Sequence, residues 1–383
     1  MRVFLVAGEA SGDRLGAALM AGLKSLKDVE FLGVGGPLMQ AEGMQSLFPM
    51  DELSVMGLAE ILPKYPQLRR RLHQTAEAVL ATQPDVLITI DSPDFSLRVA
   101  KLVKAKSSIR TVHYVAPSVW AWRPGRAIKM AKVIDHVLAL LPFEPPYMAS
   151  AGMDCDFVGH PVVSEQVATD DQVSDFKEKY EIGNNPVLLV LPGSRRGEVS
   201  RLAPIFGQTL RQVLEHHPEI QLVLPTTATV TDMVRQHTLE WPKAPIILDP
   251  REMKSEEYAI EKASSFRLAD WALAASGTVS LELAAAETPM VIAYDMNWIS
   301  RALISRMLRV DTLTLVNLVS DTRAVPECLG KDCQADIISP KLLELMENPG
   351  DQIAAMRLTM DRLGKGGEAP GLRAAKAVLN RMP

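Results

Sequence analysis

The stretches VFLVAGEASGD at residues 3–13 and VLLVLPGSRRGE at residues 187–198 decide the fold of this 383-residue chain. Each begins with an apolar run, passes through a turn that contains glycine, and continues into a helix-like sequence. A buried parallel strand followed by a glycine turn and a helix opens a nucleotide-binding α/β sheet. Two such openings predict an α/β protein of two doubly wound Rossmann-like domains. We expect a cleft between them, with a donor on one domain and an acceptor on the other.

Strand and helix patterns alternate through both halves of the chain. Most strands are continuous apolar runs, which is typical of parallel strands covered by helices on both faces of a sheet. The predicted strands are Val3–Ala7, Phe31–Val34, Val86–Ile90, Thr111–Val115, Val137–Leu141 and Asp156–Val158, then Val187–Leu191, Gln221–Pro225, Ile246–Leu248, Trp271–Ala275 and Met290–Tyr294. The polar segment 164–185 marks a boundary, so we expect domains at residues 1–165 and 186–365.

The composition is that of a soluble globular protein, with 47% hydrophobic and 23% charged residues. The net charge of −5 argues against nucleic acid as a partner. The 3 cysteines form no disulfide framework, the first strand starts without a leader, and no apolar run reaches the roughly 18–20 residues of a membrane span. We therefore expect a cytoplasmic protein. The 7 histidines show no metal-ligand spacing, so no metal site is predicted.

The loop from Gly8 to Gly16 carries two carboxylates. It is not a dinucleotide fingerprint, because its glycines are spaced four apart and Glu9 and Asp13 stand where a phosphate would approach. We interpret it as an acceptor loop that holds sugar hydroxyls. In the alternative interpretation, Asp13 only caps its helix.

Two further carboxylates, Asp91 and Asp94, follow the predicted strand Val86–Ile90. A carboxylate at the carboxyl edge of a parallel sheet is well placed to act as a general base. Alternatively, Asp91 forms a turn and Asp94 is an N-cap. His113, on a neighbouring strand, is either a site residue or a core histidine.

The turn at Gly193, Ser194 and Arg195 is a candidate phosphate site. We expect the first two residues to expose backbone N–H groups at a strand end, and the forked guanidinium of Arg195 to reach a diphosphate. A solvated arginine in a turn is the alternative.

A second candidate phosphate site is SGT at residues 276–278, where an apolar strand ends and a helix starts at once. The amides of Ser276, Gly277 and Thr278 suit a pyrophosphate. Glu282 lies four residues past Thr278 on the same helical face, where a carboxylate could bind two ribose hydroxyls. The alternative is a surface glutamate in a first turn.

Two segments combine apolar residues with arginines in a manner suited to an anionic lipid surface. They are residues 57–72 (GLAEILPKYPQLRRRL) and 298–309 (WISRALISRMLR). A helix packed on its own domain is the alternative for each. Pro63 and Pro66 predict that the first segment is not a continuous helix.

Long motifs of the chain closely resemble the lipid-A-disaccharide synthase family. They run in order from residue 3 to about residue 320: VAGEASGD (6–13), MGLAEIL (56–62), IDSPDF (90–95), HYVAPSVWAWRPGR (113–126), LPFE (141–144), FVGHP (157–161), LPGSRRGEV (191–199) and SGTVSLE (276–282). The resemblance implies a two-domain glycosyltransferase of the B type. It also implies that the last helix, within residues 366–383, returns to the N-terminal domain.

The resemblance further implies a reaction and a set of site residues. The reaction is transfer of 2,3-diacylglucosamine from its UDP conjugate to 2,3-diacylglucosamine 1-phosphate (lipid X), with inversion, no cofactor and no metal ion. The nucleotide set is Gly193, Ser194, Arg195, Ser276, Gly277, Thr278, Glu282 and Asn317; Asp91 is the expected base, with Asp94, Glu9, Asp13 and His113 as further candidates. The implied location is the cytoplasmic face of the inner membrane, as a peripheral protein and a possible homodimer.

Two other functions remain open from the residues alone. The same two-domain fold suits a nucleotide-sugar epimerase or hydrolase, which would release UDP without forming a disaccharide. A non-catalytic nucleotide-binding protein is a third possibility. The acidic Gly8–Gly16 loop and Asp91 argue against it, because a pure binder needs no carboxylates opposite the phosphate site.

Overall fold

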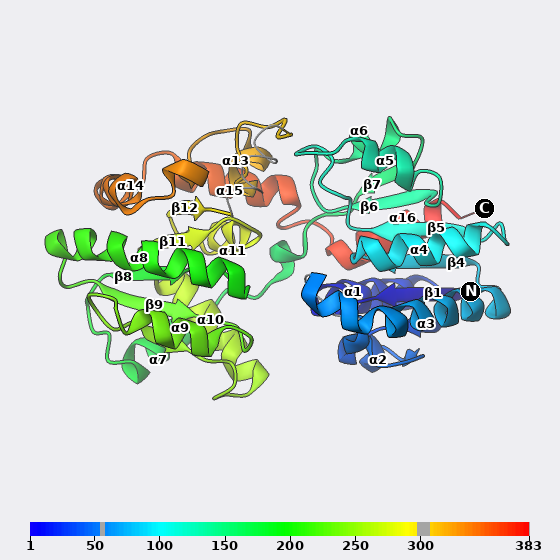
Figure 1. The fold of residues 1–383 in the computed structure, drawn as a ribbon, viewed down its shortest axis with the longest axis horizontal. Helices are drawn as coiled ribbons and strands as arrows, with labels where there is room; N and C mark the ends of the chain where they lie inside the picture. Colours follow the sequence, from blue (N-terminus) through cyan, green and yellow to red (C-terminus); the bar gives the residue numbers. More distant parts are fainter. Residues whose placement is uncertain (54–57, 297–306, 383) are drawn as a thin grey trace. The chain divides into compact units, whose positions relative to one another are not determined.

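A computed structural model describes residues 1–53, 58–296 and 307–382 of the chain. It divides into two compact units: unit 1 is Met1–Ser164 with Leu363–Pro383, and unit 2 is Glu165–Arg362. Each unit contains one parallel sheet with helices around it (Figure 1). The α/β class with two Rossmann-like sheets, predicted from the sequence, is therefore confirmed.

Unit 1 is built on a seven-stranded parallel sheet in the order β3-β2-β1-β4-β5-β6-β7. Its strands are β1 (Arg2–Ala7), β2 (Glu30–Val34), β3 (Gln45–Ser46), β4 (Val86–Ile90), β5 (Arg110–Tyr114), β6 (His136–Ala139) and β7 (Asp154–Phe157). Its helices are α1 (Ala10–Leu26), α2 (Pro37–Ala41), α3 (Leu58–Thr82), α4 (Pro93–Lys104), α5 (Gly125–Met130), α6 (Pro145–Ala149) and α16 (Pro370–Asn380).

Unit 2 repeats the architecture on a six-stranded parallel sheet in the order β10-β9-β8-β11-β12-β13. Its strands are β8 (Val187–Leu191), β9 (Gln221–Pro225), β10 (Ile246–Leu248), β11 (Trp271–Ala275), β12 (Met290–Tyr294) and β13 (Glu327–Leu329). Its helices are α7 (Asp170–Lys179), α8 (Arg196–His216), α9 (Thr231–Thr238), α10 (Ser255–Leu268), α11 (Val279–Ala286), α13 (Leu315–Ser320), α14 (Ala335–Glu347) and α15 (Gln352–Leu363).

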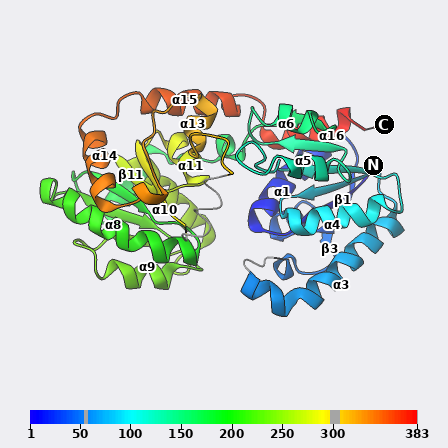
Figure 2. The ribbon, with the colours of Figure 1, turned by 45° about the horizontal axis from the view of Figure 1, so that its top comes forward.

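Alternate residues of the central strands explain why helices cover both faces of the unit 1 sheet. Val3 and Leu5 of β1 pack in one apolar cluster with residues of α1 and α16. Phe4 and Val6 pack in another cluster with residues of α3 and α4, which lie together in Figure 2. A strand that is apolar on both faces has no solvent-facing side. The apolar run in the sequence is continuous because both faces of the strand are buried under helices.

Helix α3 differs from the sequence prediction, because it continues from Leu58 to Thr82 through Pro63 and Pro66. Each proline removes one backbone donor from a helix of 25 residues, and the remaining turns keep the segment helical. Residue 57 and residues 298–306, which make up most of the second segment predicted to suit a lipid surface, lie outside the described residues. Among the described helices, none is both long and apolar enough to cross a membrane.

Helix α16 packs against α1 at a crossing made of small residues. A side chain added at Gly371 would place its Cβ 2.4 Å from the carbonyl oxygen of Ala18. A Cβ at Gly22 would similarly lie 2.6 Å from the carbonyl oxygen of Gly371. Such distances leave no room for a methyl group, so these glycines allow the two backbones to approach closely.

We expect Gly371→Ala to destabilise unit 1 by about 2–3 kcal/mol, because the new methyl group meets backbone that cannot move away as a side chain would. The measurement is thermal unfolding together with hydrogen exchange of the α1 amides. Gly125→Ala is the matched control, since nothing lies within 4 Å of a Cβ built there. Equal stability of the two variants would contradict the close packing of α1 on α16.

Candidate active site

The strand orders locate one candidate ligand crevice in each unit. In open parallel sheets, ligands bind outside the carboxyl ends of the strands, at the point where the strand order reverses. In unit 1 that point lies between β1 and β4, where Ala7 pairs with Ile90. In unit 2 it lies between β8 and β11, where Leu191 pairs with Ala274. The sequence-predicted loops at Gly8, Asp91, Gly193 and Ser276 follow these strands directly.

The turn after β4 in unit 1 has an unusual backbone. Asp91 and Ser92 have φ values of +51° and +44°, in the left-handed region that non-glycine residues rarely adopt. Gly8 makes room for this turn, because a Cβ at Gly8 would lie 2.8 Å from the Ser92 hydroxyl oxygen. That hydroxyl is buried without a hydrogen-bond partner among the described residues. Backbone strain of this kind persists only where surrounding contacts hold it in place, and it clusters at active sites.

Asp91 and Asp94 have different environments. The backbone N–H of Asp91 donates to the carbonyl of Tyr114, and its own carbonyl accepts from the Ser96 hydroxyl. Within the described residues, no donor is recorded for the Asp91 carboxylate, which leaves it available to a ligand. Asp94 is exposed in the first turn of α4, where the N-cap is Ser92. Asp94 is therefore not the N-cap that the sequence allowed.

Asp13 caps a helix, but not its own. Its carboxylate is 3% exposed and accepts hydrogen bonds from the backbone N–H groups of Gly36, Leu38 and Met39, at 2.9, 3.0 and 3.0 Å. These amides are at the N-terminus of α2. The interpretation of Asp13 as a group for sugar hydroxyls is corrected, because the carboxylate is occupied by backbone donors. Glu9, the N-cap residue of α1, is partly exposed and remains a candidate.

His113 matches the core alternative more closely than a catalytic role. The ring is buried on β5, and its Nδ1 lies 2.7 Å from the hydroxyl of Thr89 on β4. Burial lowers the pKa of His113 to about 4. The imidazole is therefore neutral near pH 7.

Glu144 is a buried carboxylate that the sequence reasoning did not select. Its side chain accepts from the Trp120 indole N–H at 3.2 Å and from the Leu141 amide at 3.0 Å, so it joins the loops that follow β5 and β6. The Trp120 ring also meets Phe143 edge to face, with centroids 5.2 Å apart. Burial raises the pKa of Glu144 to about 7. Its place in the LPFE motif is the sequence feature that points to it.

The raised pKa of Glu144 predicts a pH-dependent loss of stability. The folded protein retains this proton to about pH 7, whereas the unfolded chain releases it near its ordinary pKa of 4.5. Stability contributed by Glu144 therefore falls as pH rises from 4.5 to 7, by about 3 kcal/mol. Urea unfolding measures the free energy of unfolding of the wild type and of Glu144→Gln. The difference between the two values should change by that amount between pH 4.5 and pH 7. A difference that does not change with pH would contradict the buried proton.

The turn after β8 in unit 2 differs from the expected phosphate cradle. Gly193 has a φ of +114°, and its missing side chain makes space for Glu198. The Glu198 carboxylate accepts from the backbone N–H groups of Ser194 and Arg195, at 3.1 and 3.3 Å. The expectation that the Ser194 amide is exposed is therefore wrong, because a first-turn glutamate caps it. The Arg195 side chain is 65% exposed, with Glu198 3.5 Å away.

The turn after β11 keeps its amides available. Thr278 is the N-cap of α11, and Gly277 and Thr278 are exposed. No acceptor is recorded, within the described ranges, for the amides of Gly277, Thr278 and Val279. These N–H groups and the helix dipole make this turn the better anion site of unit 2. Glu282 follows in the same helix, with its carboxylate paired to Lys262 of α10.

Asn317 does not present its amide to a ligand. The side chain is 1% exposed, donates to the carbonyl of Val325 at 2.9 Å and accepts from the Val325 amide at 3.0 Å. A further donation reaches the Thr312 hydroxyl at 3.3 Å. The expectation that Asn317 contacts the nucleotide is therefore corrected to a structural role, since these bonds hold the loop after α13.

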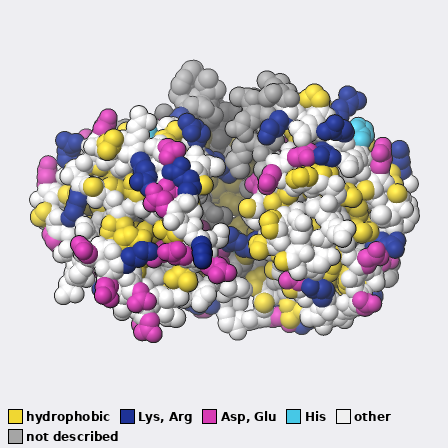
Figure 3. Space-filling model, turned by 90° about the horizontal axis from the view of Figure 1, so that it is seen from below, with side chains coloured by type: hydrophobic (Ala, Val, Ile, Leu, Met, Phe, Trp, Pro, Cys, Tyr) yellow, Lys and Arg dark blue, Asp and Glu magenta, His cyan; other side chains and the backbone are white. Residues whose placement is uncertain are grey.

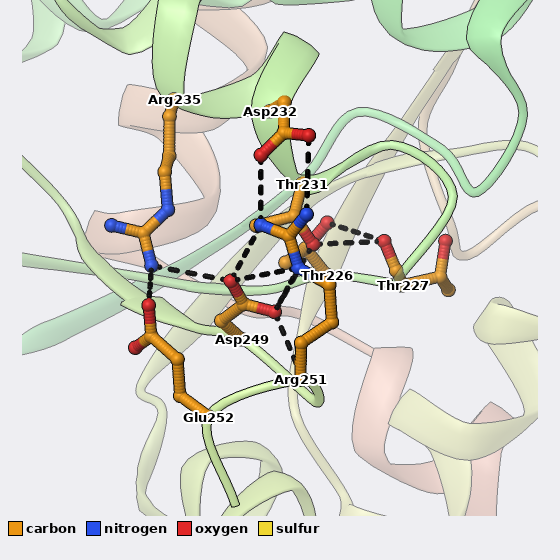
Figure 4. A network of polar contacts seen from close by, with 8 residues as sticks. All are labelled: Thr226, Thr227, Thr231, Asp232, Arg235, Asp249, Arg251 and Glu252. Carbon is orange, nitrogen blue, oxygen red and sulfur yellow. Dashed lines mark hydrogen bonds and ion pairs between the residues drawn. The ribbon is translucent and has the colours of Figure 1, made fainter.

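A charged network fixes the loop after β10 (Figure 4). Asp249 is 1% exposed, and its carboxylate accepts hydrogen bonds from Nε of Arg251 at 3.0 Å and from Nη2 of Arg251 at 2.8 Å. Arg235 of α9 lies 3.2 Å from the same carboxylate, and Arg251 also pairs with Asp232. The Arg251 hydrogen bond lowers the pKa of Asp249 well below its usual range. A buried carboxylate between two guanidinium groups stays charged, so this loop is held rigidly at the carboxyl edge of the sheet.

The face drawn in Figure 3 shows no dominance of one charge. On the face in Figure 3, basic and acidic side chains are interspersed on both units, as expected from 41 basic and 46 acidic residues. Among the described residues, no group of three or more His, Cys, Asp or Glu side chains is placed to hold a metal ion.

Comparison with solved structures finds enzymes that are similar in fold over the whole chain. The UDP-GlcNAc 2-epimerase from Neisseria meningitidis, solved with UDP-GlcNAc, is similar with a TM-score of 0.66 and 12% identity, covering 99% of both chains. The sucrose-phosphate synthase from Thermosynechococcus elongatus has a TM-score of 0.61 and 13% identity, covering 100% of this chain and 98% of the other. At such identities the likeness shows the fold, that of two-domain glycosyltransferases and epimerases.

Sequence comparison then identifies the family. The profile of the lipid-A-disaccharide synthetase family matches residues 3–378, and the chain belongs to this family. The lipid-A-disaccharide synthase of Ruegeria pomeroyi is 64% identical, over 100% of this chain and 96% of the relative. That of Rhodospirillum centenum is 46% identical, over 99% and 94%. The resemblance inferred from the motifs is confirmed.

Proposed function

We propose that this protein is an inverting glycosyltransferase of lipid A biosynthesis. It transfers 2,3-diacylglucosamine from UDP to the 6-hydroxyl of 2,3-diacylglucosamine 1-phosphate and releases UDP. The observation that carries the proposal is full-length family membership, at 64% identity to a lipid-A-disaccharide synthase. The epimerase alternative rests on fold likeness alone, at 12–14% identity, and is not favoured.

Asp91 acts as the general base in unit 1. Its carboxylate has no recorded donor within the described residues, and the backbone at Asp91 and Ser92 is held in an unusual conformation by neighbouring contacts. Removal of the acceptor proton makes the 6-hydroxyl oxygen a nucleophile for the anomeric carbon. The C–O bond to UDP breaks as the new glycosidic bond forms, so one displacement inverts the configuration.

Unit 2 stabilises the departing UDP without a metal ion. The amides at Gly277 and Thr278 and the guanidinium of Arg195 provide positive charge where negative charge develops on the diphosphate. The Glu282 carboxylate accepts hydrogen bonds from the ribose hydroxyls. The donor therefore belongs to the unit whose turn after β11 has uncapped amides, and the acceptor to the unit that carries Asp91.

The acyl chains of both substrates favour peripheral contact with the cytoplasmic face of the inner membrane. In helix α3, Lys64, Tyr65, Arg69 and Arg70 are exposed, a combination of basic and aromatic side chains suited to an anionic interface. Pelleting with vesicles that contain anionic lipid tests this contact. Homodimer formation stays a prediction, and light scattering tests it by measuring the mass of the protein in solution.

The test of the proposed function is incubation of the protein with UDP-2,3-diacylglucosamine and lipid X in the presence of EDTA. Mass spectrometry should detect the tetraacyl disaccharide 1-phosphate and UDP in equal amounts. UDP formed without disaccharide would instead indicate a hydrolase. Absence of turnover with both substrates would contradict the proposal.

A further inference from the structure

Helix α10 brings a lysine to the candidate nucleotide site from a stretch that carries no recognisable motif. Lys262 lies in the middle of α10, and its ammonium group pairs with Oε2 of Glu282 on α11. The two side chains are 36% and 27% exposed, so the pair is partly shielded from solvent. The Lys262 ammonium also lies 5.2 Å from the centre of the Phe266 ring. Partial burial makes such a pair stronger than a fully exposed one.

A hydrogen bond to the residue that follows β9 holds α10 in place. Tyr258, one turn before Lys262 on the same helical face, donates its hydroxyl to the carbonyl of Thr226 at 2.5 Å, directly after β9. Burial raises the pKa of Tyr258 to about 12, so this hydroxyl remains a donor at neutral pH. Lys262 is therefore presented by a helix that is anchored at the carboxyl edge of the sheet.

Glu282 needs a partner of this kind if a nucleotide binds beside it. The carboxylate lies in the first turn of α11, the helix whose N-terminal amides suit a diphosphate. Two anions this close repel each other in a partly shielded site. A lysine that engages one carboxylate oxygen reduces this repulsion and leaves the other oxygen for a hydroxyl, because no donor to Oε1 is recorded within the described ranges.

We propose that Lys262 is a positioning residue for the nucleotide: it orients Glu282 toward the ribose hydroxyls and neutralises its charge beside the diphosphate. The inference rests on the proposed function, which assigns Glu282 to the ribose. Lys262 acts through Glu282 and not on the ligand directly. Its effect must therefore depend on the presence of the Glu282 carboxylate.

The experiment is a double-mutant cycle with UDP as the probe, measured by calorimetry on the full chain. Lys262→Met should weaken UDP binding about tenfold, the cost of one charge-assisted hydrogen bond. In a Glu282→Gln background the same change should weaken binding threefold or less. Lys262→Arg should restore most of the affinity, because it keeps the positive charge and the donors.

The matched control is Lys179→Met. Lys179 of α7 forms a lysine–glutamate pair with Glu261 of α10 at 2.7 Å. This pair involves the same helix as Lys262 but does not involve α11. We expect UDP affinity to be unchanged in this variant. A loss equal to that of Lys262→Met would overturn the inference, because it would reflect general weakening of α10.

Other outcomes separate this inference from the proposed function. If Lys262→Met weakens UDP equally in the presence and absence of the Glu282 carboxylate, Lys262 acts independently and the inference is wrong. If Glu282→Gln weakens UDP but Lys262→Met does not, only the inference fails. If the wild type does not bind UDP, the nucleotide site itself is wrong and both proposals fall.

Discussion

Asp91→Asn is expected to lower kcat for disaccharide formation by about 10³ while the protein remains folded. A general base contributes about 10²–10⁴ to a rate, and asparagine cannot accept the acceptor proton. Asparagine is the appropriate replacement because Asp91 has a φ of +51°, a conformation that asparagine tolerates better than alanine. The measurement is initial velocity at saturating concentrations of both substrates, together with the melting temperature.

Asp94→Asn distinguishes the two carboxylates of the motif. Asp94 is exposed in the first turn of α4, where its charge complements the helix dipole. We expect it to retain kcat within about threefold and to lose a few tenths of a kcal/mol of stability. If instead Asp94→Asn removes activity and Asp91→Asn does not, the base is assigned to the wrong residue. Equal losses would indicate that the motif is needed as a whole.

The sequence predicted the strands of both sheets closely, because parallel strands covered on both faces are apolar throughout. The strands Val86–Ile90, Val187–Leu191 and Trp271–Ala275 have the predicted limits. The short edge strands β3 and β13 were not predicted, since two or three residues give no periodicity. Their existence depends on pairing with β2 and β12.

The sequence located the candidate site loops but not the partners of their side chains. Motif position correctly placed Asp91 and Thr278 after central strands. It could not show that Asp13 caps α2, or that Glu198 covers the amides of Ser194 and Arg195. These are contacts that form only once the chain is folded. The type of residue in a loop does not reveal whether a ligand or a backbone group occupies its side chain.

Lys262 is a residue of the candidate site that the sequence did not indicate at all. Its helix, α10, contains none of the family motifs, and Lys262 is 20 residues from Glu282 in the sequence. Only the parallel-sheet topology, which sets α10 beside α11, brings the two charges together. Residues that act through another residue are therefore the part of a site least accessible to sequence reasoning.

Arg195→Ala is expected to lower kcat/KM by about 10²–10³ through loss of charge stabilisation on the departing diphosphate. The Arg195 backbone is fixed by Glu198, whereas its side chain is 65% exposed and, among the residues that the structure describes, forms a 3.5 Å ion pair with that carboxylate. A guanidinium in that state can turn to a diphosphate at little cost. Arg195→Lys should recover part of the rate, because a lysine supplies charge without the two-pronged geometry.

Arg196→Ala is the matched control for Arg195, because it removes the same charge from the adjacent, exposed first position of α8. If the diphosphate responds only to the general positive field of the turn, the two variants lose similar rates and both effects shrink with added salt. If Arg195 contacts the diphosphate, its loss exceeds that of Arg196 by more than tenfold and persists at high salt. The second result is expected, since salt screens a direct, charge-assisted hydrogen bond to the diphosphate far less than it screens a distant charge.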